Sequence, residues 1–280
     1  CIFCAPHEFF FLAGSEQWKN ESIIANSVML NTEQPQTDWF TRGIIYLFMA
    51  KGVIDFSYQN CEIFASMGLK TFHFDPLVSS APSVVEDEDR KNNFYKILPE
   101  EAKTVSDDSK VFSERAIDVS FFGNDSRKRD KFFSKNARYF SEKECFIYYR
   151  KSQGPIRDSG NYKILSRIPS YVADNTKISL NIHRDEDPYF EWHRIVKQGL
   201  ARGAVVIIEE CLPHPLYKPG KHFLVETPRH MPNLIEWLLN TPEGTAVAEN
   251  IQKENMTILN DKDLIRSKNN DLLCFICGLD

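Results

Sequence analysis

The chain has 280 residues, of which 42% are hydrophobic and 26% are charged, as is usual for a globular protein with one large core or two modest ones. The formal net charge of -5 at pH 7 argues against a general nucleic-acid binder. No apolar run reaches the roughly 20 residues of a membrane-spanning helix, so we expect no transmembrane segment. Peripheral association with a membrane stays compatible with the sequence.

The seven cysteines favour a reduced, cytoplasmic protein, because their number is odd and most of them lie in apolar runs. Two pairs, Cys1/Cys4 and Cys274/Cys277, have Cys-x-x-Cys spacing, which is also found in zinc sites. Both pairs are embedded in apolar residues without a turn glycine between the thiols. We therefore interpret them as packing residues and expect no metal site.

The opening segment, CIFCAPHEFFFLAG, lacks the basic start of a signal peptide and has the pattern of a strand that enters a loop. We therefore expect the chain to begin inside a domain. Residues 1–85 continue with alternating strand and helix signals, which predict a Rossmann-like domain around a parallel sheet. Because its first strand has no partner before it, we expect this N-terminal domain to be incomplete.

Polar residues follow three of the strands predicted in this domain. His7 and Glu8 follow the first strand, the stretch Asn31–Gln34 follows the second, and Asp55 closes the third. A histidine at the carboxyl end of a strand is well placed to act as a general base. We therefore predict that His7 and Glu8 are catalytic.

Two charged stretches, SVVEDEDRKNN and TVSDDSK, interrupt this rhythm and predict a linker over residues 86–116. A second βα domain is expected over residues 117–260. The tail, residues 261–280, ends in apolar residues and is expected to pack back onto the protein.

The second domain is organised around the stretch 177–210. Two β-branched runs, Ile178–Ile182 and Ala204–Ile208, predict buried parallel strands, and Phe190–Arg202 between them predicts a crossover helix. Ligands of such sheets bind beyond the carboxyl ends of the strands. The candidates for binding there are His183, Arg184, Glu191, Arg194, Glu209 and Glu210.

Two glycine turns in this domain have the character of anion sites. Gly123 and Ser126 connect a predicted strand to a basic helix that begins with Arg127 and Arg129, and a helix N-terminus favours an anion. The full dinucleotide-binding glycine pattern is absent, so a capped, solvated helix start explains this turn equally well. The second turn consists of Gly220, Lys221 and His222.

The two βα domains resemble a GT-B glycosyltransferase, in which two Rossmann-like doubly wound domains face a cleft. Residues 117–255 are similar to the CgeB-like, group 1-related bacterial glycosyltransferases. The matching segments are the D-V-x-F-x-G strand Asp118–Gly123 with Arg127 and Arg129, the segment Leu180–Arg184, the helix and strand Glu191–Val206, the P-G-x-H loop Pro219–His222, and the helices Leu234–Leu239 and Gly244–Ile251.

The resemblance implies that a sugar is transferred from a nucleotide-sugar donor to an acceptor hydroxyl of a glycan, polysaccharide or other bacterial glycoconjugate. It implies that the C-terminal domain holds the nucleotide without a metal ion or other cofactor, and that the N-terminal domain holds the acceptor. One position departs from the large retaining families, because Lys197 or Gln198 stands where their second glutamate is expected. The retaining assignment is therefore left open.

Two other functions fit the same pattern. A sugar-nucleotide 2-epimerase shares the two-domain arrangement and would convert a UDP-sugar without an acceptor. A non-catalytic protein would bind a nucleotide sugar or a partner protein without turnover. The sequence identifies neither the donor, the acceptor nor the oligomeric state.

Overall fold

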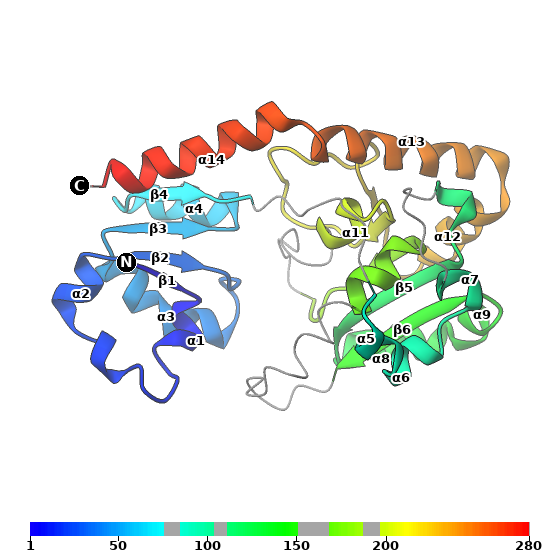
Figure 1. Cartoon of the computed structure of the whole chain (residues 1–280), viewed down its shortest axis with the longest axis horizontal. Helices are drawn as coiled ribbons and strands as arrows, with labels where there is room; N and C mark the ends of the chain where they lie inside the picture. The colour runs from blue at the N-terminus through cyan, green and yellow to red at the C-terminus, as the bar shows by residue number, and fades with distance from the viewer. Residues whose placement is uncertain (76–84, 104–110, 151–167, 187–196, 280) are drawn as a thin grey trace. The chain divides into compact units, whose positions relative to one another are not determined.

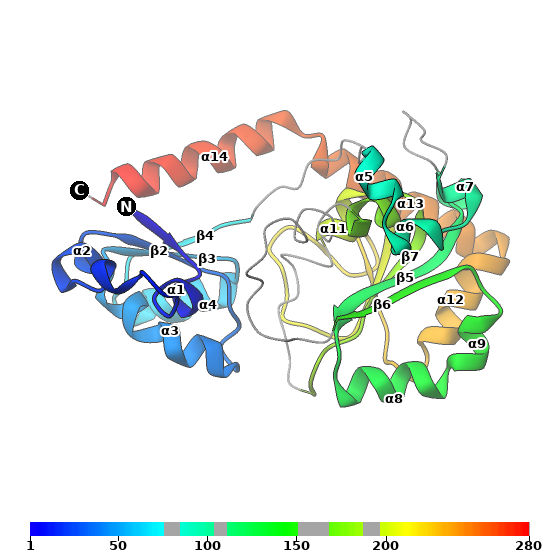
Figure 2. The ribbon, with the colours of Figure 1, turned by 60° about the horizontal axis from the view of Figure 1, so that its bottom comes forward.

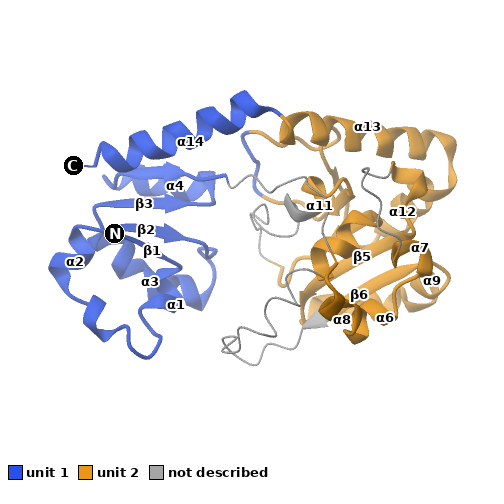
Figure 3. Cartoon of the chain, in the orientation of Figure 1, with its two compact units in different colours: residues 1–77, 212–215, 261–280 blue, residues 78–211, 216–260 orange. Residues whose placement is uncertain are grey.

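A computed structural model of the chain describes residues 1–75, 85–103, 111–150, 168–186 and 197–279. The chain divides into two compact units, which Figure 3 distinguishes by colour. Unit 1 comprises residues 1–77, 212–215 and 261–280, and unit 2 comprises residues 78–211 and 216–260. Each unit is built on one parallel sheet, which confirms the predicted α/β class.

Unit 1 contains a four-stranded sheet in which the strand order, β1-β2-β3-β4, follows the chain. The strands are β1 (Ile2–Cys4), β2 (Val28–Asn31), β3 (Gly52–Asp55) and β4 (Thr71–His73). The helices are α1 (Pro6–Phe9), α2 (Glu21–Ala25), α3 (Asp38–Met49), α4 (Tyr58–Ser66) and α14 (Lys262–Cys277), with a 3₁₀ helix at Glu16–Trp18.

Two helical layers bury the faces of this sheet. On one face, the buried side chains of α3 pack against Phe3, Met29 and Val53 of the first three strands. On the other face, apolar side chains of α14, and Leu279 just after it, pack against Val28 and Ile54. Figure 1 shows α14 running alongside the unit 1 sheet. The C-terminal residues therefore complete the core of the unit formed by the N-terminal residues.

Unit 2 contains a five-stranded parallel sheet in the order β6-β5-β7-β8-β9. The strands are β5 (Ile117–Asn124), β6 (Cys145–Arg150), β7 (Thr176–Asn181), β8 (Val205–Ile208) and β9 (Leu224–Val225). The helices are α5 (Asp87–Arg90), α6 (Asn93–Lys96), α7 (Glu100–Lys103), α8 (Arg127–Lys135), α9 (Ala137–Ser141), α11 (Lys197–Ala201), α12 (Met231–Asn240) and α13 (Pro242–Leu259), with a 3₁₀ helix at Phe112–Glu114.

All strands of this sheet are parallel, but the direction in which the chain adds new strands reverses at β5. The chain moves from β5 outward to β6, and then returns to the other side of β5 to form β7, β8 and β9. Figure 2 shows α8, α9 and α12 on one side of the sheet and α11 on the other. A reversal of this kind opens a crevice at the carboxyl ends of the two central strands, where open α/β sheets bind ligands.

Several segments predicted from the sequence can be compared with the elements of unit 2. The predicted strands 178–182 and 204–208 are confirmed as β7 and β8. Of the predicted helix 190–202, α11 accounts for the end, and residues 190–196 lie outside the described residues. The stretch 86–116, expected to be a linker, contributes three short helices to unit 2, and Tyr95, Leu98 and Ala102 are buried in its core because they pack on Phe146 and Tyr171.

A buried arginine joins the amino-terminal side of the unit 2 sheet. Arg115 donates to the carbonyl oxygens of Ala173 at 3.1 Å, Thr176 at 3.0 Å and Arg202 at 2.9 Å. Burial lowers its pKa to about 10, which leaves it charged at neutral pH. Gly203 lies against this guanidinium with a φ of +73°, and an added Cβ would lie 2.5 Å from the nearest Arg115 nitrogen. Only glycine fits this turn without displacing Arg115.

We expect Gly203→Ala to lower the free energy of unfolding by more than Gly220→Ala. Both glycines have a positive φ, so each alanine carries backbone strain on the order of 1–3 kcal/mol. Nothing lies within 4 Å of a Cβ at Gly220, whereas a Cβ at Gly203 meets Arg115. Urea unfolding followed by circular dichroism measures the difference, and equal losses in the two variants would contradict this account.

Candidate functional site

The carboxyl ends of β5, β7 and β8 carry polar groups on one edge of unit 2. The strand β5 ends at Asn124 and leads into α8, His183 follows β7, and Glu209 follows β8. This edge includes the reversal between β5 and β7. It is therefore the place in unit 2 where the topology predicts a ligand.

The start of α8 is fixed by its own sequence. Ser126 is the N-cap, and its hydroxyl accepts a hydrogen bond from the main-chain N–H of Arg129 at 3.2 Å. A Cβ at Gly123 would lie 2.6 Å from the Phe121 ring and 3.0 Å from the Arg129 guanidinium. The predicted glycine turn therefore lets the strand end and the helix start approach closely.

Arg129 holds this edge together through main-chain carbonyls. It is buried, and its guanidinium donates to the carbonyl oxygens of Ile182 and Asn124, both at 2.8 Å. The guanidinium also lies over the ring of Phe121, 5.3 Å from the centroid. Arg129 was predicted to belong to an anion site at the start of this helix. In the structure its guanidinium joins the ends of β5 and β7, and it adds a fixed positive charge beneath the edge.

Lys128 places an ammonium among the polar groups of this edge. Its ammonium lies 2.7 Å from Glu209 and 3.1 Å from Glu186, and it donates to the carbonyl oxygen of Asp185 at 3.1 Å. Burial acts to lower its pKa, but the hydrogen bonds and charges of the two glutamates outweigh burial and raise it. Lys128 is therefore charged at neutral pH. Glu186 is largely exposed, so this partner can be exchanged for an anionic ligand.

Glu209 connects β8 to β7 and α8. One carboxylate oxygen accepts from the main-chain N–H of His183 at 2.7 Å, and the other contacts Lys128. Both oxygens are thus engaged inside the protein. Glu209 was predicted to bind the ligand at this edge. In the structure it sets the position of Lys128.

His183 is a buried, neutral member of this edge. Burial, together with the charges of Lys128 and Arg129, lowers the pKa of its imidazole to about 4. At neutral pH His183 therefore adds no positive charge to that of Lys128 and the arginines.

The other predicted binding residues of unit 2 do not all lie at this edge. Exposed side chains on or next to this edge belong to Arg127, Arg184 and Glu210. Lys221 is exposed and lies 3.3 Å from Glu254. Glu191 and Arg194 lie outside the described residues.

The turn Gly220–His222 lies toward the opposite edge of the sheet. It precedes β9, which runs parallel to β8, so it lies on the side where these strands begin. Asn255 of α13 donates to the carbonyl oxygen of His222 at 2.8 Å, and Gln252, one turn earlier, approaches Gly203, which precedes β8. The structure therefore separates this turn from the Gly123 turn, because a parallel strand must begin at the edge opposite its end.

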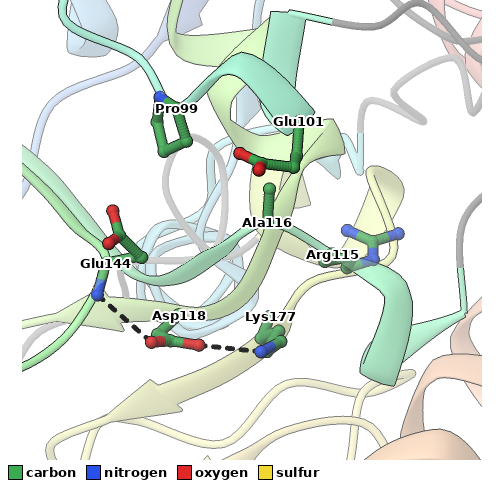
Figure 4. Close-up of a pocket in the computed structure, with 7 residues that line it drawn as sticks. All are labelled: Pro99, Glu101, Arg115, Ala116, Asp118, Glu144 and Lys177. Carbon is green, nitrogen blue, oxygen red and sulfur yellow. Dashed lines mark hydrogen bonds and ion pairs between the residues drawn. The ribbon is translucent and has the colours of Figure 1, made fainter.

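A pocket of about 520 Å³ also lies where β5 and β7 begin (Figure 4). It is lined by Pro99, Glu101, Arg115, Ala116, Asp118, Glu144 and Lys177. Asp118 accepts from the Lys177 ammonium at 2.8 Å and from the main-chain N–H of Glu144 at 3.2 Å. The opposite charges of Asp118 and Lys177 therefore neutralise each other, at an edge where such sheets do not usually bind ligands.

In unit 1, the predicted catalytic residues lie on α1, directly after β1. His7 is buried, and its Nε2 lies 3.8 Å from a carboxylate oxygen of Glu33. Burial lowers the pKa of His7, although the charges of Glu33 and Glu8 act to raise it. Glu8 is exposed. The structure thus places His7 beneath the edge of the sheet and gives it a carboxylate neighbour from the loop after β2.

The sequence reasoning missed Lys128 and named its neighbours Arg127 and Arg129 instead. The pair Phe132 and Phe133 was the sequence signal that could have identified Lys128. These residues mark the buried side of α8, and Arg129 lies three and four positions before them, on the same side of the helix. Arg129 is therefore inside, and the residue before it borders the sheet edge.

Comparison with solved structures shows glycosyltransferases of the GT-B fold. HepE of Anabaena, solved in complex with UDP, matches with a TM-score of 0.54 and 10% identity over 92% of this chain and 77% of that chain. A TarM mutant of S. aureus, solved with UDP among its ligands, matches with a TM-score of 0.57 and 12% identity over 98% of this chain and 55% of that chain. Sucrose-phosphate synthase of Thermosynechococcus elongatus has a TM-score of 0.50 and 12% identity, with 90% and 68% covered.

These identities are low, so the likeness concerns the fold, and it confirms the predicted resemblance to GT-B glycosyltransferases at that level. The chain spans little more than half of the TarM chain. No family model and no curated protein sequence matches it. Within the described residues, no helix combines the length and the apolar character needed to cross a bilayer.

We expect the contribution of His183 to the free energy of unfolding to fall as the pH is lowered from about 6.5 to about 4. The pKa of His183 is about 4 in the folded protein and has its ordinary value of 6.5 in the unfolded chain, so only the unfolded chain takes up a proton in this interval. The full effect is on the order of 3 kcal/mol. Urea unfolding at several pH values should show a shallower loss for His183→Gln. The variant of the exposed His230, His230→Gln, should follow the wild type, and equal slopes for His183→Gln and wild type would refute the assignment.

Proposed function

We propose that this protein transfers a sugar from a nucleotide-sugar donor to an acceptor hydroxyl, and that unit 2 binds the donor diphosphate. The observation that carries this proposal is Lys128, a charged ammonium at the first turn of α8, beside the carboxyl ends of the two strands at which the sheet reverses. The GT-B fold, shared with a HepE structure that contains UDP, supports it.

The chemistry of the proposed reaction requires stabilisation of negative charge. When the bond between the sugar and the diphosphate breaks, charge develops on the departing phosphate oxygens. An ammonium and the unpaired first-turn N–H groups of a helix stabilise that charge best when they are already in position. Glu209 positions Lys128, and the diphosphate would replace the exposed Glu186 as its second partner. The exposed side chains of Arg127 and Arg184 supply further positive charge nearby.

In this proposal the cations of the protein neutralise the diphosphate, so transfer does not depend on a metal ion. We expect activity to be retained after treatment with EDTA. Unit 1 would bind the acceptor, as the resemblance implies. An acceptor in the form of a glycan or another hydroxyl-bearing glycoconjugate is part of the proposal.

A melting-temperature screen with UDP, GDP and dTDP tests the donor site. At a concentration of 100 times the dissociation constant, a bound nucleotide stabilises a protein by about 2.7 kcal/mol, and the melting temperature rises accordingly. We expect Lys128→Gln to weaken binding of the responding nucleotide by about tenfold or more, equivalent to about 1.4 kcal/mol. Lys131→Gln is the matched control, because Lys131 is an exposed lysine of the same helix.

Three outcomes would contradict the proposed function. If no nucleoside diphosphate shifts the melting temperature, unit 2 is not a donor site. If a UDP-sugar is converted into its epimer without transfer, the epimerase interpretation is correct. If a nucleotide binds but no donor sugar is transferred or hydrolysed, the protein is a non-catalytic binder.

A further inference from the structure

The carboxyl edge of the unit 1 sheet contains a connected polar network. Asp55, at the end of β3, accepts hydrogen bonds from the side-chain amides of Asn31 at 2.8 Å and Asn60 at 3.1 Å, and from the main-chain N–H of Ser57 at 2.7 Å. The first of these bonds joins the end of β3 to the end of β2. Asp55 and Asn31 are both buried, so this part of the network is rigid and lies below the surface.

The network fixes the loop that carries Glu33. The Asn31 side chain donates to the carbonyl oxygen of Glu33 at 2.9 Å and accepts from the main-chain N–H of Glu33 at 3.3 Å. One carboxylate oxygen of Glu33 accepts from the N–H of Gln34 at 3.0 Å, and the other lies 3.8 Å from His7. The Glu33 side chain is 25% exposed, whereas that of His7 is 5% exposed. Glu33 is therefore the member of this pair that a ligand in solvent can reach.

An exposed tryptophan borders the same histidine. Trp39, in the first turn of α3, is 42% exposed, and its ring lies 6.4 Å from the His7 ring at an interplanar angle of 68°. The guanidinium of Arg42 lies 4.8 Å from the centre of the Trp39 ring. Thr37 caps α3 by accepting from the N–H of Phe40 at 3.1 Å, which fixes the start of the helix. The tryptophan is thus held at the surface although burial would be favourable for so large an apolar ring.

We propose that Glu33, Trp39 and Arg42 form a carbohydrate-binding site, at which the acceptor presents a sugar ring. This inference rests on the proposed function and specifies its acceptor. A sugar ring has an apolar C–H face, which packs on an exposed aromatic ring, and hydroxyl groups at its edge. The carboxylate of Glu33 accepts hydrogen bonds from such hydroxyls, and the guanidinium of Arg42 donates to them. A flat apolar surface combined with a few fixed polar groups is the usual composition of a small-molecule site.

The assignment also gives the predicted catalytic pair a different arrangement. His7 was predicted to be catalytic, but its imidazole is buried and lies 3.8 Å from the more exposed Glu33 carboxylate. The carboxylate of Glu33, held by the Asn31 network, is the group that contacts an acceptor hydroxyl. Glu33 therefore binds the acceptor, whose hydroxyl is the nucleophile of the proposed reaction.

Saturation-transfer NMR on the full chain tests the site with the methyl β-glycosides of glucose, galactose, mannose and N-acetylglucosamine as probes. We expect transfer to the axial protons of one ring face for at least one probe, and none to glycerol, which has hydroxyls but no ring face. Trp39→Leu should abolish the transfer, and Glu33→Gln should weaken binding roughly tenfold, because a hydrogen bond to a charged acceptor is lost.

Two matched variants serve as controls. Trp18→Leu removes another tryptophan of unit 1 with a similar exposure, 38%, and Glu21→Gln neutralises an exposed glutamate in the first turn of α2. Both should bind the glycoside as the wild type does. The proposal is overturned if no probe gives transfer to the wild type, if Trp39→Leu and Glu33→Gln bind normally, or if the control variants lose binding equally.

The response to nucleoside diphosphates, measured on the same variants, separates this inference from the proposed function. A normal melting-temperature shift with unchanged glycoside binding in Trp39→Leu refutes the carbohydrate site alone. Absence of any nucleotide shift in the wild type refutes the proposed donor site, whatever the glycoside results are.

Discussion

The contact of Glu209 with His183 and Lys128 is the interaction on which the edge of unit 2 depends. The carboxylate joins the ends of β7 and β8 to the start of α8, and it does so at the side of the sheet where the topology opens a crevice. A buried carboxylate needs a charged or hydrogen-bonding partner, and a buried ammonium needs the same. Each group therefore fixes the other, and Lys128 is held in place before any ligand arrives.

At each end of the unit 2 sheet, a buried arginine donates hydrogen bonds to main-chain carbonyls. Arg129 donates to main-chain carbonyls of Ile182 and Asn124 at the end where the strands finish, and Arg115 donates to three carbonyls at the end where they begin. Between them, the apolar strand residues supply non-directional stabilisation. The directional bonds of the arginines determine how the loops leave the sheet, and hence where side chains such as Lys128 lie.

The sequence was informative about the fold because β-branched runs such as Ile178–Ile182 have few alternatives to a buried strand. It predicted the position of His183 and of the Gly123 turn for the same reason, since the residue after a buried strand must lie at the edge of the sheet. The basic residues Arg127 to Arg129 were not told apart at that stage. Which of them faces the sheet depends on the rotation of α8 over the core, and only the pair Phe132 and Phe133 indicates that rotation in the sequence. The Gly220 turn was grouped with the ligand-binding residues although it precedes a strand, and a turn before a parallel strand lies at the edge where the strands begin.

The same limit applies to unit 1. A pattern shows that Asn31, Glu33 and Asp55 follow strands, but only the hydrogen bonds show that Asn31 fixes Glu33 while Asp55 fixes Asn31. The two edges then differ in chemistry. The edge of unit 2 presents a positioned ammonium, which suits a diphosphate. The edge of unit 1 presents the carboxylate of Glu33 and the exposed Trp39, both neighbours of His7, with Arg42 over the Trp39 ring, and this combination suits a neutral, hydroxyl-rich ring. Under the proposed function, this difference would direct the donor to unit 2 and the acceptor to unit 1 without any change in the architecture that the two units share.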